Sequence, residues 1–145
     1  MQIEMNILQG NNIAVVGTSR NKHKFGYMIF KELRKRKLNP IPINPHTDEI
    51  DGVKCHRSVK DCPEKIDTVI TVVPPELTLS IVKESLEKGI KNIWFQQGSE
   101  SKDAIEYCRQ NELNFVPGKC VLMYLEPVRS IHKFHRFFTK LFGKY

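Results

Sequence analysis

Residues 12–20 read NIAVVGTSR, and this stretch decides the fold. The apolar run from Ile13 to Val16 is typical of a buried strand, and it leads directly into Gly17 and two small hydroxyl residues. Helical periodicity begins at about Lys24. A strand, a tight turn and the amino end of a helix bring backbone N–H groups and the positive end of the helix dipole together. The stretch therefore predicts a binding site for an anionic group such as a phosphate.

Strand and helix patterns alternate along the chain, which predicts a mostly parallel sheet covered by helices on both faces. The expected strands are Ile13–Val16, Pro40–Asn44, Thr68–Val73, Asn92–Phe95 and Asn114–Val116, with a short extra strand near Val53–Cys55. The expected helices bury Phe25, Ile29 and Leu33, then Leu77, Ile81 and Val82, and after an N-cap at Ser101 they bury Ala104, Ile105 and Cys108. The predicted fold is one three-layer α/β domain with about five strands.

The second expected strand contains Pro42, which has no N–H to give to a sheet. Either this strand is very short, or Pro42 occupies a position where no donor is needed.

Length and charge narrow the class of protein. At 145 residues the chain fits a single domain with a core of its own. The 23 Lys and Arg residues against 16 Asp and Glu residues give a net charge of +7. This balance favours anionic ligands, which include nucleotides, nucleic acids and acidic membrane surfaces, without choosing among them.

The cysteines indicate a reducing compartment. The four are widely spaced, and neither a secretory signal nor an apolar run long enough to span a bilayer is recognisable, so we expect free thiols and a cytoplasmic protein. Cys55, His56 and Cys62 lie close together in the sequence. They lack a second ligand pair at zinc-site spacing, so no metal site is predicted.

The loop after the first strand offers two kinds of phosphate ligand. Thr18 and Ser19 carry hydroxyl groups, and Arg20 and Lys24 carry positive charge. With Gly17 as the only clear glycine of a dinucleotide fingerprint, the motif G-x-G-x-x-G does not match. The alternative is a plain strand-to-helix turn with solvated basic residues.

The second strand ends in Asn44, Pro45 and His46. NAD-binding domains usually hold an acid at this position to bind the ribose hydroxyls. An asparagine followed by a base favours a ribose that carries a phosphate. The alternative is that Asn44 and Pro45 only form a turn.

Residues after the later strands complete the candidate site. Val73, Pro74 and Pro75 predict an apolar wall beside a ligand, or only the start of a helix. After the fourth strand, Trp94 and Phe95 are expected in the core and Gln96, Gln97 and Gly98 at the rim.

Cys120 follows the fifth strand and is either a reactive thiol or a passive one. No histidine or acid is spaced to activate it, so no catalytic set is identified and an enzyme is not favoured.

The last segment differs from the rest. Residues 1–126 are expected to form the α/β domain and residues 127–145 a basic amphipathic helix, with Ile131, Phe134, Phe138 and Leu141 on its apolar face. Such a face normally packs on its own domain or on a second copy, which favours a homodimer. Contact of residues 129–145 with nucleic acid or a membrane is the alternative.

Several segments in order carry a family resemblance. They are AVVGTSR (14–20), PINP (42–45), Ser58-Val59 with Cys62-Pro63, IDTV (66–69), IWFQQG (93–98) and Cys120. From about Asn11 to Glu126 the chain resembles the small stand-alone CoA-binding domains, which are related to the CoA-binding domain of the succinyl-CoA synthetase alpha subunit.

The resemblance implies a Rossmann-like domain that binds coenzyme A (CoA) along the carboxyl ends of its strands. It assigns Gly17, Thr18, Ser19 and Arg20 to a phosphate loop and Asn44, Pro45 and His46 to the adenosine end. It assigns Val73, Pro74 and Pro75 to a wall beside the ligand and Gln97 and Gly98 to the next loop. It implies no reaction.

The predicted function is therefore binding of CoA or an acyl-CoA by a non-catalytic or regulatory module. Two alternatives stay open. One is an NAD(P)-type redox sensor or enzyme that uses Cys120, and the other is an adaptor for nucleic acid or a membrane that works through the basic end of the chain.

Overall fold

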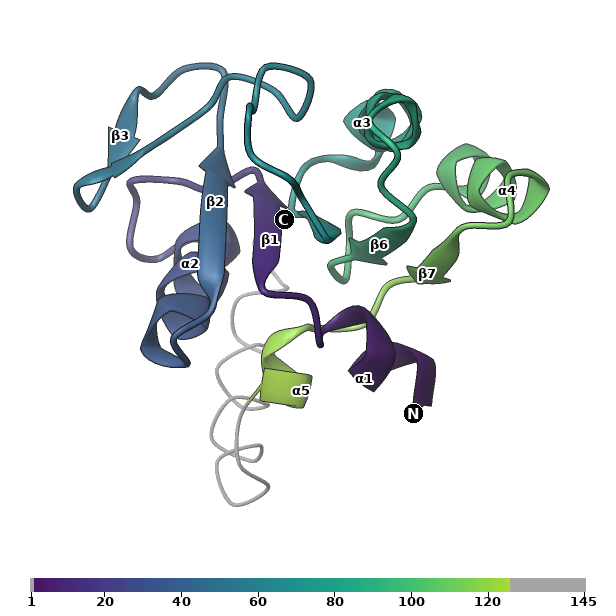
Figure 1. Cartoon of the computed structure of the whole chain (residues 1–145), viewed down its shortest axis with the longest axis horizontal. Coiled ribbons are helices and arrows are strands. Elements are labelled where there is room, and N and C mark those ends of the chain that lie inside the picture. The colour runs from purple at the N-terminus through teal and green to yellow at the C-terminus, as the bar shows by residue number, and fades with distance from the viewer. Residues whose placement is uncertain (1, 126–145) are drawn as a thin grey trace.

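The computed structural model describes residues 2–125 (Figure 1). Its helices are α1 (Gln2–Ile7), α2 (Phe25–Lys35), α3 (Pro75–Glu87), α4 (Lys102–Gln110) and α5 (Leu122–Leu125). Its strands are β1 (Asn12–Val16), β2 (Asn39–Ile43), β3 (Glu49–Ile50), β4 (Val53–Lys54), β5 (Thr68–Thr71), β6 (Asn92–Phe95) and β7 (Asn114–Val116). The predicted helix within residues 127–145 lies outside the described residues.

The main sheet has five strands in the order β2-β1-β5-β6-β7, and every neighbouring pair is parallel. Strands β3 and β4 form a separate antiparallel pair. The predicted α/β class and all five strand positions are confirmed, although β5 ends at Thr71, two residues earlier than expected. The chain first moves outward from β1 to β2 and then crosses back to β5, so the direction of winding reverses between β1 and β5.

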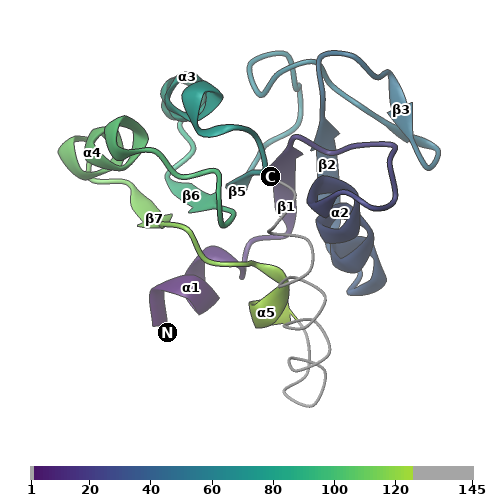
Figure 2. The same ribbon diagram turned by 180° about the vertical axis from the view of Figure 1, so that it is seen from behind.

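Side chains along β1 alternate between the two faces of the sheet, as the period of a strand requires. Ile13 and Val15 pack with α1, α2 and α5, whereas Ala14 and Val16 pack with α3 and α4. The two opposite views show these two groups of helices on opposite sides of the sheet (Figures 1 and 2). The strands are buried on both faces, which explains their nearly continuous apolar sequences.

The two prolines of β2 are explained by its place at the edge of the sheet. Asn39 and Ile43 form hydrogen bonds toward β1, through Asn39 N to Asn11 O and Gly17 N to Ile43 O. Pro40 and Pro42 therefore face away from β1, where the pairing of His56 with Ile43 uses the Pro42 carbonyl oxygen and needs no proline N–H. The second of the two expected explanations for Pro42 is correct.

Asparagines begin four of the five strands in the main sheet and hydrogen-bond across its amino edge. Asn39 Nδ2 donates to Asn12 Oδ1 at 3.0 Å, and Asn114 Nδ2 donates to Asn92 Oδ1 at 3.0 Å. Asp67, just before β5, accepts the Asn12 N–H at 2.9 Å. These bonds hold the strands in register at the edge opposite their carboxyl ends.

Helix α1 was not expected from the sequence, because it has six residues and a mixed polar composition. Its Ile7 is buried against the sheet, and its Glu4 side chain is 4% exposed and lies 2.7 Å from Lys119 Nζ. The hydrogen bond from Lys119 is the largest reason why the pKa of Glu4 falls from 4.5 to about 2. The ion pair therefore ties the start of the chain to the loop after β7.

Two glycines allow α2 to approach the loop after β1. Gly17 has φ +105°, and a Cβ there would overlap the carbonyl oxygen of Val72. A Cβ at Gly26, in the first turn of α2, would overlap the carbonyl oxygen of Gly17. The helix amino end, the β1 loop and the end of β5 thus touch through backbone atoms.

We expect Gly26→Ala to destabilise the protein by about 1–3 kcal/mol, because the added methyl group forces backbone atoms apart. In an ordinary helix the same change stabilises by about 1 kcal/mol, so the sign of the effect is informative. Urea unfolding measures it. The exposed Lys31→Ala in the same helix is the control and should change stability by less than about 0.5 kcal/mol. A Gly26→Ala protein as stable as the wild type would contradict the close contact.

We expect the stabilising effect of Glu4 to depend on pH. Its pKa is lowered on folding, so the carboxylate stabilises the fold above its ordinary pKa of 4.5 and loses this effect as the pH falls toward about 2. The difference in unfolding free energy between wild type and Glu4→Gln should shrink over that interval. Glu106→Gln, at a 56% exposed side chain, is the control. A difference that stays constant down to pH 2 would rule out the ion pair.

Candidate functional site

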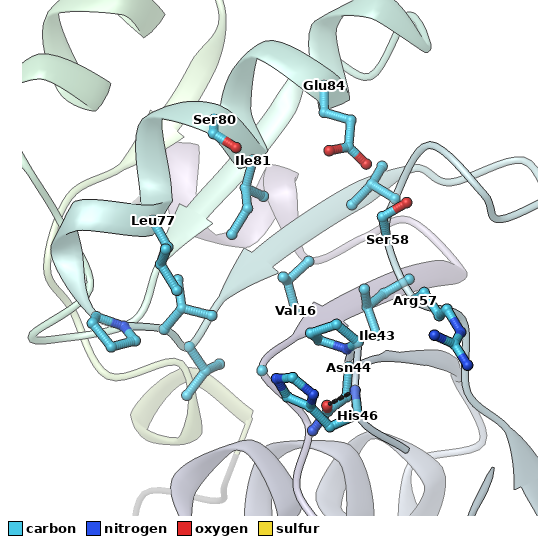
Figure 3. Close-up of a pocket in the computed structure, with 16 residues that line it drawn as sticks. Val16, Ile43, Asn44, His46, Arg57, Ser58, Leu77, Ser80, Ile81 and Glu84 are labelled. Carbon is cyan, nitrogen blue, oxygen red and sulfur yellow. Dashed lines mark hydrogen bonds between the residues drawn. The ribbon is translucent and has the colours of Figure 1, made fainter. Parts of the chain in front are cut away.

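A pocket of about 410 Å³ opens at the carboxyl ends of β1, β2 and β5, beside α3 (Figure 3). Its floor includes Val16 and Gly17 from β1 and its loop, and Ile43 from β2. Open α/β sheets bind ligands in the crevice where the winding reverses, which is where this pocket lies. It is therefore the candidate site.

The loop after β1 differs in detail from the prediction. The Thr18 side chain is fully buried, and its hydroxyl donates to Val15 O at 2.6 Å, so the prediction that this hydroxyl faces a phosphate is wrong. Ser19 Oγ accepts the Asn21 N–H, and Arg20 Nε donates to Glu49 O at 3.2 Å. What the loop itself presents to the pocket is Gly17.

Lys24 occupies the N-cap position of α2, and its side chain makes no capping hydrogen bond. The first turn of this helix carries no acidic residue either. The positive end of the α2 dipole therefore lies next to Gly17 without an acidic or hydroxyl residue at the N-cap.

Asn44 ties together the loops around the pocket. Its Nδ2 donates to Thr18 O at 2.8 Å, and its Oδ1 accepts the His46 N–H at 2.8 Å. Its backbone N–H donates to His56 O at 2.9 Å. The turn that the sequence suggested is present, and the same side chain also joins the β1 loop to the β2 loop. An aspartate could not replace it, because a carboxylate oxygen would face the Thr18 carbonyl.

Two basic side chains line the pocket near the end of β2. His46, predicted to follow the second strand near the ligand, lines the pocket and is exposed. Arg57 was missed by the sequence reasoning; its side chain is 72% exposed, and its Nη2 lies 3.9 Å from Asp48 Oδ1. It reaches the pocket because residue 56 pairs with Ile43 and brings the following segment alongside β2. A local pattern could not reveal this pairing.

Helix α3 is rotated relative to the prediction. Val82 is buried as expected, but Leu77 is 53% exposed and lines the pocket, so its prediction as a core residue is wrong. The side facing the sheet carries Thr78 and Ser85, whose hydroxyls are satisfied by Ser99 O and Ile81 O. Because these buried residues are polar, the hydrophobicity pattern of the sequence does not identify the core face of the helix.

Val73 and Pro74 line the pocket at the end of β5, as predicted. The β6 loop supports this wall: Ser99 Oγ donates to Thr71 Oγ1 at 2.9 Å and accepts the Val73 N–H at 3.4 Å.

The other residues after β6 and β7 lie away from the pocket. Trp94 and Phe95 are fully buried, as expected. Gln96, expected at the rim, is also buried: its Nε2 donates to Cys120 Sγ at 3.2 Å, and its Oε1 accepts the Val121 N–H. Gln97 and Gly98 are exposed but do not line the pocket. Cys120 is 5% exposed, and burial raises the pKa of its thiol, which opposes a nucleophilic role.

The described part of the chain also bears on metal binding and membrane insertion. Within residues 2–125, no group of three or more histidine, cysteine, aspartate or glutamate side chains is placed to hold a metal ion. None of the helices among these residues is both long enough and apolar enough to cross a bilayer.

The family model described as a CoA binding domain matches residues 11–126. The chain belongs to the CoA-binding domain family. The alpha subunit of an ADP-forming acetate–CoA ligase II from Pyrococcus furiosus is 31% identical over 120 residues, covering 75% of this chain. The chain spans only 26% of that subunit. The expected relationship to this family is confirmed.

Two further relatives have about the size of this domain. The uncharacterized protein YneT of Bacillus subtilis is 28% identical over 120 residues, which cover 83% of this chain and 89% of YneT. A solved structure of a conserved hypothetical protein from Pyrococcus furiosus has a TM-score of 0.76 and 37% identity, and the match covers 79% of this chain and 99% of that one. The match therefore extends over nearly the whole length of both of these proteins.

We expect the four thiols to react slowly in the folded protein. All are buried, and burial raises the pKa of each, that of Cys108 to about 12. Labelling with an aromatic disulfide reagent should be at least about a hundredfold slower in buffer than in denaturant. Lys102→Cys, at an exposed position, is the control and should add one fast site. A native thiol that reacts at the control's rate would restore the reactive-cysteine alternative.

Proposed function

We propose that this protein binds CoA or an acyl-CoA in the pocket at the ends of β1, β2 and β5, as a non-catalytic or regulatory module. Membership of the CoA-binding domain family supports the ligand class. The observation that carries the proposal is the lining of the pocket by Gly17, which contacts the amino end of α2, and by the basic side chains of His46 and Arg57.

The diphosphate of CoA fits the backbone around Gly17. Gly17 lines the pocket, and the adjacent amino end of α2 supplies a favourable dipole. Ser19, Arg20 and Lys24 stay candidates for further contacts, because they belong to the same loop although they do not line the pocket.

The 3′-phosphate of CoA fits the mouth of the pocket near the end of β2. His46 and Arg57 are the basic side chains that line the pocket, and an acid that would bind a free ribose diol is replaced by Asn44. Among the described residues that line the pocket, Glu84 on α3 is the only one with an acidic side chain. This arrangement disfavours NAD, whose adenosine ribose carries no phosphate at its 2′ or 3′ position.

The pantetheine arm would leave along the apolar wall of Val73 and Pro74 toward Gln97 and Gly98. Any group carried by its thiol would then meet solvent or another protein beyond the β6 loop. Any chemistry on that group is proposed to come from a partner protein. A cytoplasmic location and a homodimer remain predictions from the sequence, as does the separation of residues 127–145 from the domain.

Calorimetric titration of the ligand-free protein with CoA, dephospho-CoA and NAD tests the proposal. Binding of CoA that weakens without the 3′-phosphate is the expected result. Binding of NAD in place of CoA would favour the dinucleotide alternative, and absence of binding to all three would overturn the proposal. In that last case, nucleic acid and acidic vesicles would be titrated against the chain with and without residues 127–145.

We expect Arg57→Ala to weaken CoA binding by about fivefold, because it removes a solvent-exposed contact with a phosphate. Dephospho-CoA should be affected little, so the ratio of the two dissociation constants reports the role of Arg57. The control is Arg109→Ala. Arg109 lies on α4, is also exposed and does not line the pocket. Equal weakening for both ligands would assign Arg57 to another part of the ligand.

A further inference from the structure

Helix α3 turns one continuous face toward the pocket. Leu77, Ser80, Ile81 and Glu84 all line it, and their spacing of three and four residues places them on one side of a helix. They form two rows, an apolar row of Leu77 and Ile81 and a polar row of Ser80 and Glu84. Figure 3 shows this face above the floor formed by Val16 and Ile43.

The apolar row faces other apolar side chains across the pocket. Ile43 and Val16 lie on the sheet side, opposite Ile81 and Leu77. Leu77 is 53% exposed, a large apolar surface that a bound ligand would cover. A flat, largely apolar ring fits between these two sides, because it buries surface on both of its faces.

Glu84 stands at the end of this apolar space. Its Oε1 accepts the Lys60 N–H at 2.5 Å, which fixes the orientation of the carboxylate. Figure 3 shows the carboxylate directed from α3 toward Ser58. Ser58 is itself held in a turn, since its hydroxyl donates to Asp61 Oδ2 at 3.0 Å and accepts the Asp61 N–H. The acid is therefore positioned by backbone and turn contacts.

An acid in a pocket for a polyanionic ligand is unfavourable unless it meets a hydrogen-bond donor. Glu84 lies on α3, whereas His46 and Arg57 lie on the chain segments at the end of β2. In the nucleotide part of CoA, the donor farthest from the phosphates is the exocyclic amine of adenine. A carboxylate accepts hydrogen bonds only, so it distinguishes this amine from a carbonyl oxygen at the same ring position.

We propose that Glu84 accepts a hydrogen bond from the exocyclic amine of the adenine, with the ring held between Leu77 and Ile81 on one side and Ile43 and Val16 on the other. The pocket would then select adenine over hypoxanthine, which carries an oxygen in place of the amine. This inference rests on the proposed function, because it concerns the base of the same ligand.

The test compares CoA with its hypoxanthine analogue by calorimetric titration of the full chain. We expect the wild-type protein to prefer CoA by about tenfold, because the oxygen of hypoxanthine would face a carboxylate that cannot donate. In Glu84→Gln, the side-chain oxygen can keep the Lys60 N–H while the amide nitrogen faces the base. The preference should then disappear or reverse in favour of the analogue.

Glu87→Gln is the matched control, since Glu87 is exposed on the same helix and does not line the pocket. It should leave the ratio of the two dissociation constants unchanged. The wild-type comparison needs no variant, so a poorly folded Glu84→Gln protein does not prevent a decision.

The outcomes separate the two claims. If CoA does not bind, the proposed function fails and the inference falls with it. If CoA binds with a dependence on its 3′-phosphate but the analogue binds equally well, the proposed function stands and the role of Glu84 is overturned. That role is also overturned if the wild-type protein and Glu84→Gln show the same ratio of dissociation constants.

Discussion

The backbone of α2 rests directly on the loop after β1, because neither Gly17 nor Gly26 carries a side chain at the contact. Gly17 in turn lies against the carbonyl group of Val72, so one glycine touches both the helix and the end of β5. This contact places the amino end of α2 at the carboxyl edge of the sheet. Any larger residue at either position would separate the helix from the pocket and remove its dipole from the site.

Polar side chains stabilise the two edges of the sheet in different ways. At the amino edge, asparagine side chains such as those of Asn12 and Asn39 form hydrogen bonds between neighbouring strands. At the carboxyl edge, side-chain hydrogen bonds join the loops into two separate pairs. Asn44 connects the loops after β1 and β2, and Ser99 connects the ends of β5 and β6. The pocket opens between these two groups, so each of its sides is held in position by its own hydrogen bonds.

Features that depend on local sequence were predicted accurately, whereas features that depend on contacts between distant segments were not. A strand buried on both faces appears in the sequence as a short continuous apolar run. Strand positions such as Ile13–Val16 were therefore predicted within a residue or two. Arg57 was missed because it reaches the pocket through the pairing of residue 56 with Ile43, a contact between segments. The orientation of α3 was wrong at Leu77 because Thr78 and Ser85 occupy its buried side, with their hydroxyls satisfied inside the fold.

The role of Asn44 likewise depends on contacts between segments that the sequence does not reveal. Its place after the second strand suggested contact with a ribose, yet both ends of its amide are used by the protein. What this residue contributes is the shape of the two loops and the exclusion of a negative charge from that side of the pocket. The basic side chains on that side of the pocket are His46 and Arg57, which are the proposed contacts of a phosphorylated ribose.

Charge is therefore distributed unevenly around the pocket. The basic side chains of the β2 side and the α2 dipole favour the phosphates, whereas the carboxylate of Glu84 on α3 repels them. A ligand with phosphates at one end and a donor-bearing ring at the other can satisfy both sides in one orientation only. With the reverse orientation, a phosphate would meet Glu84 and the ring would leave the basic side chains without an anion. For the proposed ligand, this arrangement favours one orientation, with the ring in the apolar space beside Glu84 and the phosphates near Gly17, His46 and Arg57.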